Sequence, residues 1–469
     1  MTGHHLPIAI IGAGFSGTIA ALHLLDRLPS RTLLLCERSP TFARGAAYAT
    51  REPLHLLNVR AANMSAYPDR PRHFTEWLER TRIELPSEDW AQQVHDTGVG
   101  TFVSRDLYGR YLTSLVQGVL AEDRGALRLH LMPDEVIDLT PTSQGHCLTL
   151  AGGRQYAVAG AILAAGHLLR SQGGDGVSIT NPWSPSALED LDPGQPVVVL
   201  GTGLSMVDMV MQLWASGFPG PVIAISRRGL LPHSHVPTPS WPTPVFRHAE
   251  QQSLAQLTHR LRQEVAKAQA QGVAWQSVVD SLRQMTAHLW QRLPQAEQSR
   301  FLRHARPWWD VHRHRMAPPI AQQIAGLVRQ GYLQVRAGRL TDIETSGRQA
   351  RVRYRPRHGG ELVSLEAQRV LDARGIAAVA ETQDPLVTRL LDRGLVRLDR
   401  HRLGLDVTPD LQAVARSGST TPALWMLGPL ARGVFWECTA VPDIRLQAVQ
   451  LAVRVGEVLG SPTGLAGAC

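Results

Sequence analysis

Glycine residues at fixed spacing follow two short apolar runs, one near the start of the chain and one near its middle. The first set comprises Gly12, Gly14 and Gly17, and the second comprises Gly201 and Gly203. An apolar helical pattern follows each set, so each copy is predicted to form the strand, tight turn and helix of a βαβ unit. Glycines at such a turn let backbone amides approach a pyrophosphate at the positive end of the helix. Two copies therefore predict two bound dinucleotides.

The residue that ends the next expected strand differs between the two copies. After the first set, the run LLLC leads to Glu37, twenty residues past Gly17, where a carboxylate can accept both hydroxyls of an adenosine ribose. After the second set, the run VIAIS ends at Ser226 and is followed by Arg227 and Arg228, whose guanidinium groups suit a 2′-phosphate. The sequence thus predicts FAD at the first site and NADPH at the second. The alternative for the two arginines is that they are solvated residues after a strand.

The composition limits the class of protein. The chain has 469 residues, a formal net charge of +8 and 43 % hydrophobic residues, which suits a protein of two or three domains. Lys267 is the only lysine, and the arginines are spread along the chain without a nucleic-acid-binding motif, so no nucleic-acid partner is expected. We find no signal peptide and no run of ~18 apolar residues. We therefore expect a cytoplasmic protein without a membrane span.

The cysteines and histidines exclude several kinds of site. Cys36, Cys147, Cys438 and Cys469 are scattered without a C-x-x-C pair, so neither a disulfide framework, a zinc site nor a redox-active dithiol is expected. His312 and His314 are two residues apart, so they face opposite sides of a helix or the same side of a strand, and without a third ligand no metal site is expected there either.

Further segments predict how the chain is divided. Residues 161–167 are predicted to form an apolar strand followed by a tight turn at Gly166. Residues 369–375 are a degraded version of the same pattern. Residues 423–455 are predicted to form a strand, a glycine-rich loop and a long helix. Residues 246–324 are polar with apolar residues at helical spacing, which indicates an insertion of two or more amphipathic helices. We predict an α/β fold with two Rossmann-like dinucleotide-binding domains and a helical insertion. The expected division is an FAD-binding domain in 1–190 and 366–469 and an NADP-binding domain in 191–365.

The chain resembles the bacterial FAD/NAD(P)-binding oxidoreductases related to the class B flavin monooxygenases, which include the ornithine and lysine N-hydroxylases. The motifs that carry the resemblance are GAGFSGTIAALHLL, LHLLNVRAANMSAYPDRPRHFTEWL, FVSRDLYGRYL, ILAAGH, GTGLSMVD, SRRGLLPHSH, RPWWDVHRHRMAPP and GPLARGVFWECTAVPDIRLQA. The resemblance extends over nearly the whole length of the chain. The chain departs from the Baeyer–Villiger fingerprint, which is absent, and from the flavin-binding Gly-Asp pair of disulfide reductases, because Gly428 and Pro429 stand there.

The resemblance implies roles for residues between the glycine motifs. It places Asn58 and Met64 over the reactive face of the flavin, although the residues themselves equally suit a turn cap and a core position. It places Trp436 and Glu437 beside the flavin, although Trp436 would also suit simple packing. The expected cofactor-binding residues are Gly12, Gly14, Phe15, Ser16, Gly17, Glu37, Arg38, Arg105, Gly166, Gly201, Gly203, Leu204, Ser205, Ser226, Arg227, Arg228, Gly428 and Pro429. For Arg105, a contact to the FAD phosphates and a salt bridge are equal alternatives.

The expected function follows from both lines of argument. Two dinucleotide sites without a redox dithiol indicate an FAD-dependent, NADPH-using oxidoreductase acting on a small molecule. The resemblance favours a monooxygenase of the N-hydroxylase kind, with oxygen as second substrate. The alternatives are an NADPH-dependent flavin reductase or dehydrogenase and a flavin-binding protein without turnover. Trp308, Trp309 and Arg313 either wall the substrate pocket or pack between domains.

Overall fold

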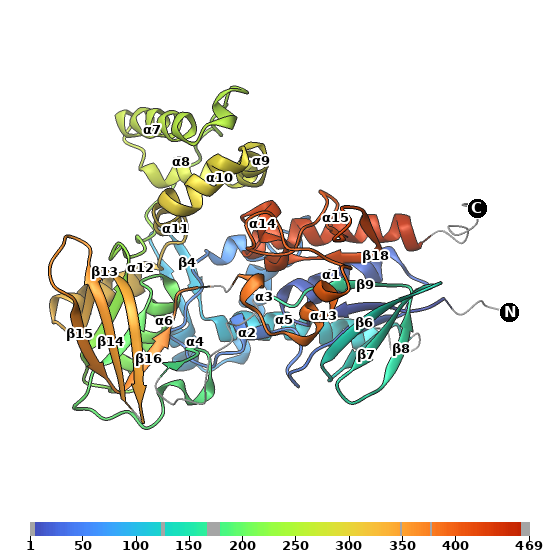
Figure 1. Cartoon of the computed structure of the whole chain (residues 1–469), viewed down its shortest axis with the longest axis horizontal. Helices are drawn as coiled ribbons and strands as arrows, with labels where there is room; N and C mark the ends of the chain where they lie inside the picture. Colours follow the sequence, from blue (N-terminus) through green and yellow to red (C-terminus); the bar gives the residue numbers. More distant parts are fainter. Residues whose placement is uncertain (1–4, 123–126, 167–178, 348, 376–377, 461–469) are drawn as a thin grey trace.

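The computed structural model describes residues 5–122, 127–166, 179–347, 349–375 and 378–460. These residues form two bodies that lie side by side, each built on its own mainly parallel sheet, and a group of helices that stands apart from both sheets (Figure 1). The first body contains the N-terminal and C-terminal parts of the chain, and the second contains its middle part.

The first body is built on a six-stranded sheet in the order β17-β18-β9-β1-β2-β5. Its strands are β1 (Ile8–Ile11), β2 (Leu33–Cys36), β5 (Leu129–Met132), β9 (Gly160–Leu163), β17 (Gln412–Val414) and β18 (Thr420–Met426). All neighbours are parallel except β17 and β18, with Ile8 opposite Leu33 on one side and Gly160 on the other. The strands β1, β2 and β9 are buried along their whole length, as continuous apolar runs in a parallel sheet require.

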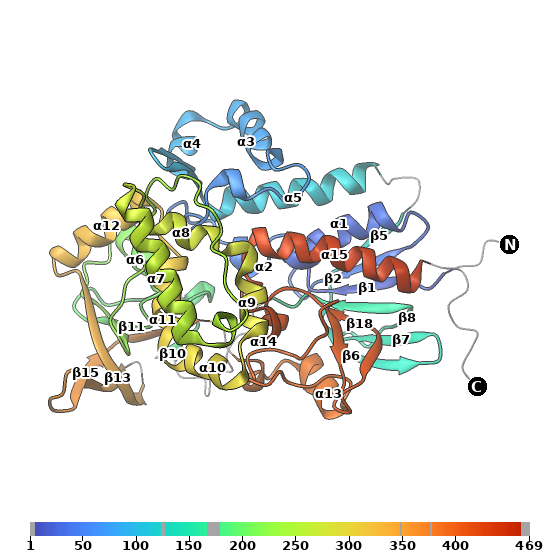
Figure 2. The same ribbon diagram turned by 90° about the horizontal axis from the view of Figure 1, so that it is seen from above.

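Helices cover this sheet because parallel strands need crossover connections. They include α1 (Phe15–Arg27), α5 (Arg105–Glu122) and α15 (Val441–Leu459), and Figure 2 shows α1 and α15 running alongside each other. Smaller elements complete the body. They are α2 (Gly45–Tyr48), η1 (Ala61–Asn63), α3 (His73–Glu84), α4 (Ser87–Gln93), α13 (Pro385–Asp392), η7 (Gly428–Ala431), α14 (Arg432–Phe435), the hairpin β3 (Val94–Thr97) and β4 (Gly100–Val103), and the antiparallel sheet of β6 (Val136–Thr142), β7 (Gly145–Leu150) and β8 (Gln155–Val158).

The second body is built on a seven-stranded sheet in the order β10-β16-β11-β12-β13-β14-β15. The strands are β10 (Ile179–Thr180), β11 (Val197–Leu200), β12 (Val222–Ser226), β13 (Leu333–Ser346), β14 (Gln349–Pro356), β15 (Val363–Ala367) and β16 (Arg369–Asp372). Pairing is parallel from β10 to β13 and antiparallel from β13 to β15. Helices α6 (Leu204–Ala215) and α12 (Pro318–Arg329) pack on it.

Two strands of the second sheet lie outside the range 191–365 expected for the second domain. Strands β10 and β16 belong to this sheet because β16 pairs with both β10 and β11, with Val198 opposite Val370. The position of a domain border along the chain depends on this long-range pairing, which the local sequence pattern does not contain. The division itself stays a prediction.

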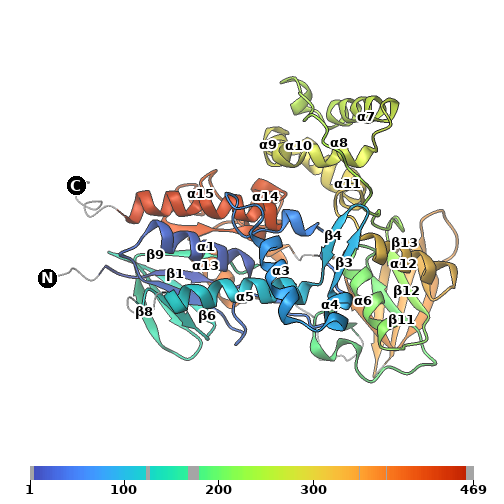
Figure 3. The ribbon, with the colours of Figure 1, turned by 180° about the vertical axis from the view of Figure 1, so that it is seen from behind.

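A group of helices lies between β12 and β13 in the sequence and stands away from both sheets (Figure 3). Its members are α7 (Leu254–Ala270), α8 (Trp275–Ser281), α9 (Thr286–Arg292), α10 (Gln295–Arg300), the π-helix η5 (Phe301–Ala305) and α11 (Arg306–Arg313). We call α7 to α11 the insertion. Its helix α9 packs against α14 of the first body, so the insertion bridges the two bodies.

Helices packed on two mainly parallel sheets confirm the predicted fold class. None of the described helices is both long and apolar enough to cross a membrane.

Candidate functional site

The two glycine turns have nearly the same backbone geometry. Gly12 has φ of +100° and Gly201 has φ of +110°, which only glycine adopts readily. A Cβ at Gly12 would lie 2.5 Å from the carbonyl oxygen of Ala164, and a Cβ at Gly201 would lie 2.5 Å from that of Ala373. In both bodies, the backbone that follows the neighbouring strand, β9 or β16, packs directly against the glycine turn. Neither glycine can therefore carry a side chain.

The helices after the two turns present open N-termini. Gly14 and Gly203 are the N-cap residues of α1 and α6, and neither helix has a capping side chain or an acidic residue in its first turn. An added Cβ at Gly203 would meet nothing within 4 Å, and one at Gly14 would meet only Gly45. Unsatisfied amides at the positive end of a helix bind phosphate oxygens, so both turns fit a dinucleotide pyrophosphate.

Of the other residues expected near these turns, Phe15, Ser16 and Gly17 form the first turn of α1, and Leu204 and Ser205 form that of α6. Gly17 is needed for close packing, because a Cβ there would lie 1.8 Å from the carbonyl oxygen of Gly12. Gly166 has φ of +67° and faces open space after β9.

The carboxylate of Glu37 lies directly beside the first turn. Its Oε2 accepts a hydrogen bond from the amide of Ala13 at 2.8 Å, and its Oε1 accepts one from the amide of Ser39 at 3.1 Å. Because Glu37 follows β2, which is the neighbour of β1, it lies one strand away from the pyrophosphate position. This placement suits the adenosine ribose of FAD. The neighbouring Arg38 is half-exposed and lies 3.8 Å from Glu135.

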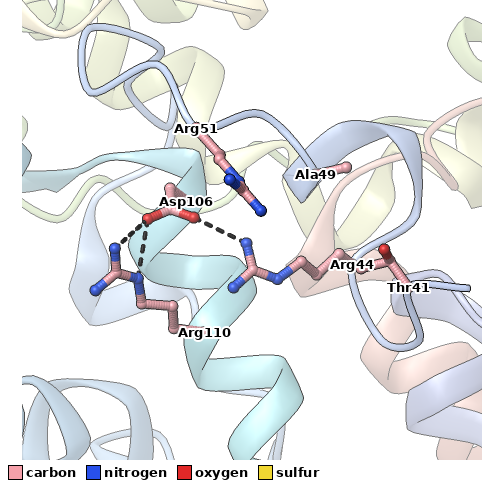
Figure 4. A pocket seen from close by; sticks show the side chains of 6 residues that line it. All are labelled: Thr41, Arg44, Ala49, Arg51, Asp106 and Arg110. Atoms are coloured by element: carbon pink, nitrogen blue, oxygen red, sulfur yellow. Dashed lines mark hydrogen bonds and ion pairs between the residues drawn. The ribbon is translucent and has the colours of Figure 1, made fainter.

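A basic cavity of about 540 Å³ lies near the first turn (Figure 4). It is lined by Thr41, Arg44, Ala49, Arg51, Asp106 and Arg110. Asp106 of α5 holds the guanidinium groups of Arg44 and Arg110, each at 2.8 Å. Three arginines around one carboxylate leave a net positive charge next to Gly45, whose Cα packs on Gly14. The cavity therefore favours an anionic ligand beside the expected pyrophosphate site.

The second body presents basic side chains where the first presents Glu37. Thr202 Oγ1 donates to Ser226 Oγ at 2.9 Å, which ties the second glycine turn to the end of β12. Arg227 is exposed, while Arg228 donates to the carbonyl oxygen of His304 at 3.2 Å and lies over the ring of Trp308. Within the described ranges neither arginine has a carboxylate within 4 Å, so both charges are available to a phosphate.

The loop with Asn58 and Met64 runs from the boundary between the two bodies into the core of the first body. The backbone carbonyl of Asn58 accepts a hydrogen bond from His235 Nε2 at 3.0 Å, and Asn58 lines a small cavity together with Leu204 of α6. Burial lowers the pKa of His235 to about 4, so this ring is neutral at neutral pH. Met64 is buried in the first body, and its carbonyl accepts from Tyr108 Oη at 3.0 Å. Of Asn58 and Met64, it is therefore Asn58 that lies at the boundary between the two bodies.

A buried ion pair joins the bodies beside this loop. Arg105 of α5 donates to Asp208 Oδ2 of α6 at 2.7 Å, and both side chains are largely buried. His55 Nε2 donates to the backbone carbonyl of Asp208 at 3.1 Å. Burial raises the pKa of Asp208, and the charge of Arg105 opposes that rise. The guanidinium of Arg105 thus binds the second body rather than pointing freely into the first.

The loop between β18 and α15 meets the insertion. Gly428 is buried with φ of +77°, and a Cβ there would lie 2.6 Å from Ser16 Oγ. Pro429 is also buried. Trp436 has φ of +59° and ψ of −68°, which is strained for a residue with a side chain. Its ring lies 5.0 Å from that of Trp290 and 5.1 Å from that of Phe301, between centroids.

Glu437 is a buried carboxylate held by helix α11. Trp309 Nε1 donates to its Oε1 at 2.7 Å, and Arg313 and His314 each lie 3.9 Å from the carboxylate. Burial by itself raises the pKa of Glu437, but His314, Arg313 and the Trp309 hydrogen bond outweigh it and lower the pKa. Glu437 is therefore ionised at neutral pH. Its partners Trp309 and Arg313 belong to the insertion. The sequence did not predict these contacts, because it showed only that charged and aromatic residues are dense in 306–314.

The described cysteines do not provide a redox site. Cys36, Cys147 and Cys438 are free, and Cys469 lies outside the described residues. Burial raises the pKa of the thiols of Cys36 and Cys438 well above neutrality. Across the described part of the chain, no group of three or more His, Cys, Asp and Glu side chains could hold a metal ion.

Comparisons with known proteins agree with this geometry. A family model described as FAD-NAD(P)-binding matches residues 9–168. No curated protein matches the chain. L-lysine 6-monooxygenase from Pseudomonas syringae is similar in structure, with a TM-score of 0.64 and 16% identity over 97% of this chain and 99% of that one. An ornithine N-hydroxylase from Kutzneria sp. 744 has a TM-score of 0.62 and 14% sequence identity, over 97% of this chain and 99% of that one.

A disulfide reductase shares the architecture less closely. The bacillithiol disulfide reductase from Bacillus cereus has a TM-score of 0.52 and 13% identity over 97% of this chain and 99% of that one. At such identities the likeness extends to the fold and not to the reaction. The resemblance to two-dinucleotide flavoproteins is therefore confirmed for the fold, and the reaction must be argued from the site.

Proposed function

We propose that this chain is an FAD-dependent, NADPH-using monooxygenase that acts on a nitrogen atom of a small amine, with oxygen as the second substrate. The observation that carries the proposal is the pair of matched glycine turns, one beside Glu37 and the other beside Arg227 and Arg228. Both turns have uncapped helix N-termini, and the residues around them fit the two cofactors. FAD, when bound, supplies hydride acceptance from NADPH and the activation of oxygen.

The residues of the chain would hold and orient the two cofactors. The amides after Gly12 and Gly14 would bind the FAD pyrophosphate, while Glu37 would accept the ribose hydroxyls. The amides after Gly203 would bind the NADPH pyrophosphate, and Arg227 and Arg228 would bind its 2′-phosphate. Asn58 would lie between the two sites, since it lines the small cavity that also contains Leu204.

The insertion would exclude water from the reacting centre. Its Trp290 donates to the carbonyl of Gly433 at 2.9 Å, and its Trp309 holds Glu437, so aromatic side chains close one side of the loop that follows β18. Exclusion of water matters more for a monooxygenase, whose activated oxygen must reach the substrate, than for a reductase. The likeness to lysine and ornithine hydroxylases supports an amine substrate.

The test measures where the electrons of NADPH go. Purified protein loaded with FAD is incubated with NADPH, oxygen and a panel of primary amines and basic amino acids. We expect at least one amine to stimulate NADPH oxidation and to yield a hydroxylamine in place of hydrogen peroxide. The alternative function, an NADPH-dependent flavin reductase, would be favoured by two results together: NADPH oxidation yields only peroxide with every amine, and an artificial electron acceptor is reduced fast.

A further inference from the structure

The order of the strands indicates the direction in which a bound FAD would extend. The pyrophosphate position is at the end of β1, and Glu37, which suits the adenosine ribose, is at the end of β2. On the opposite side of β1 come β9 and then β18. Neighbouring strands are about 4.8 Å apart, so β18 ends roughly 10 Å from β1. With its adenosine at β2, a bound dinucleotide would extend its flavin half toward the ends of β9 and β18.

The loop that follows β18 would therefore border the flavin. It starts at Gly428, which contacts Ser16 of the first turn of α1, and continues through η7 to Arg432 at the start of α14. The Arg432 residue is only 5 % exposed. A guanidinium is a permanent cation at neutral pH, and a buried cation is costly unless a negative group lies next to it.

The charges around Arg432 can be matched in pairs. Arg283 binds Asp443 at 2.7 Å, Arg306 lies 3.4 Å from Asp310, and Arg313 lies 3.9 Å from Glu437. Each of these arginines thus has a carboxylate. Arg432 makes neither an ion pair nor a side-chain hydrogen bond with any described residue, and its Nε is buried without a partner.

The charged groups around Arg432 balance its charge only at a distance, because neither Asp310 nor Asp399 forms an ion pair with it. Asp399 directs its carboxylate to its own loop, where it accepts hydrogen bonds from the amides of His401 and Gly404. The thiol of Cys438 stays neutral, because burial raises its pKa. Burial, together with the charge of Arg306, lowers the pKa of Arg432 to about 10, which leaves the guanidinium charged at neutral pH.

We propose that Arg432 is the charge partner of the bound flavin, and that its guanidinium compensates the negative charge that the ring system takes on when it is reduced. The proposal rests on the FAD site of the proposed function, but not on NADPH or on the substrate. A positive charge at the electron-rich edge of the ring stabilises the reduced form more than the oxidised form and raises the reduction potential. Reduction by NADPH then becomes more favourable.

The test compares Arg432→Met, which removes the charge, with Arg432→Lys, which keeps it. Sulfite is the probe, because it adds to oxidised flavin and leaves a negative charge on the ring, as reduction does. We expect the dissociation constant of sulfite, followed by bleaching of the flavin absorption, to rise at least about tenfold in Arg432→Met and less than about threefold in Arg432→Lys. A dye-equilibration titration should show a lower two-electron potential in Arg432→Met, by about 30 mV for each factor of ten.

The control is Arg454→Met, which removes an exposed arginine of α15 that pairs with Asp410 and Glu457 and should leave both measurements unchanged. If Arg432→Met loses FAD during purification, the titrations are made with added FAD. Equal sulfite affinity and equal potential in wild type and Arg432→Met would overturn the inference alone. A wild type that takes up no FAD would overturn the proposed function and the inference together.

Discussion

At the scale of single residues, the two glycines of the second turn should respond differently to the same change. Gly201→Ala places a Cβ 2.5 Å from the carbonyl of Ala373 at a φ of +110°, so we expect a loss of folded protein. Gly203→Ala meets no atom within 4 Å, so the variant should fold normally. Its methyl group would instead obstruct the NADPH pyrophosphate. Thermal unfolding and NADPH titration separate the two effects, and an unstable Gly203→Ala would contradict this assignment.

The choice between NADPH and NADH also belongs to single residues. Arg227→Ala combined with Arg228→Ala should remove the preference for NADPH, because each charged hydrogen bond to a 2′-phosphate contributes ~1.5 to 3 kcal/mol. The rate of flavin reduction by NADH should stay the same. Arg351→Ala, which removes an exposed arginine of β14 that pairs with Glu366, serves as the control. A wild type that uses both nucleotides equally well would contradict the 2′-phosphate site.

The sequence predicts the glycines of the two turns and Glu37 because the roles of these residues depend on local backbone geometry. The spacing of Gly12 and Gly14 after a strand, and the position of Glu37 after the next one, are local properties of a βαβ unit. Arg432 was not among the predicted residues. Its distinguishing property is a buried guanidinium without an ion pair or side-chain hydrogen bond among the described residues, and that depends on which groups of distant segments surround it.

At the scale of elements, helix α11 is expected to hold the loop before α15 through one hydrogen bond. Trp309→Phe keeps an aromatic ring but removes the donor to the buried carboxylate of Glu437. We expect a loss of about 1 to 3 kcal/mol in the free energy of unfolding, since a buried charged acceptor loses a partner. Trp308→Phe is the matched control, because Trp308 is 46 % exposed and should change the stability by less than about 0.5 kcal/mol. Equal effects from both variants in urea denaturation would refute the role of Trp309.

The pattern of the sequence predicts that helices occupy 246–324 but not what they touch. Apolar residues at spacings of three and four, such as Leu254, Leu257 and Leu261, indicate an amphipathic helix, and α7 spans all three. The contact of α9 and α11 with the loop at Gly433 and Glu437 joins segments more than 120 residues apart in the sequence. Such contacts arise from tertiary packing, which periodicity does not encode.

At the scale of the whole molecule, the interface between the two bodies contains both apolar contacts and a buried ion pair. Leu56 and Phe102 of the first body belong to the same apolar cluster as α6 and β11 of the second. Beside them, Arg105 and Asp208 form the buried ion pair, and Trp183 lies against both Arg105 and His55. The relative position of the two cofactor sites is therefore set by side chains of α5, α6 and the loop with Asn58.

Breaking this ion pair tests whether Arg105 joins the bodies or serves the cofactor. Arg105→Ala leaves the carboxylate of Asp208 buried without its partner, so we expect the free energy of unfolding of the FAD-free protein to fall by about 3 to 5 kcal/mol. The double variant Arg105→Met with Asp208→Leu removes both charges and should recover most of that loss. Arg454→Ala, which breaks an exposed pair with Asp410, should have little effect. If Arg105→Ala instead unfolds like the wild type but binds FAD more weakly, then Arg105 acts on the FAD phosphates, and the joint between α5 and α6 depends on apolar packing alone.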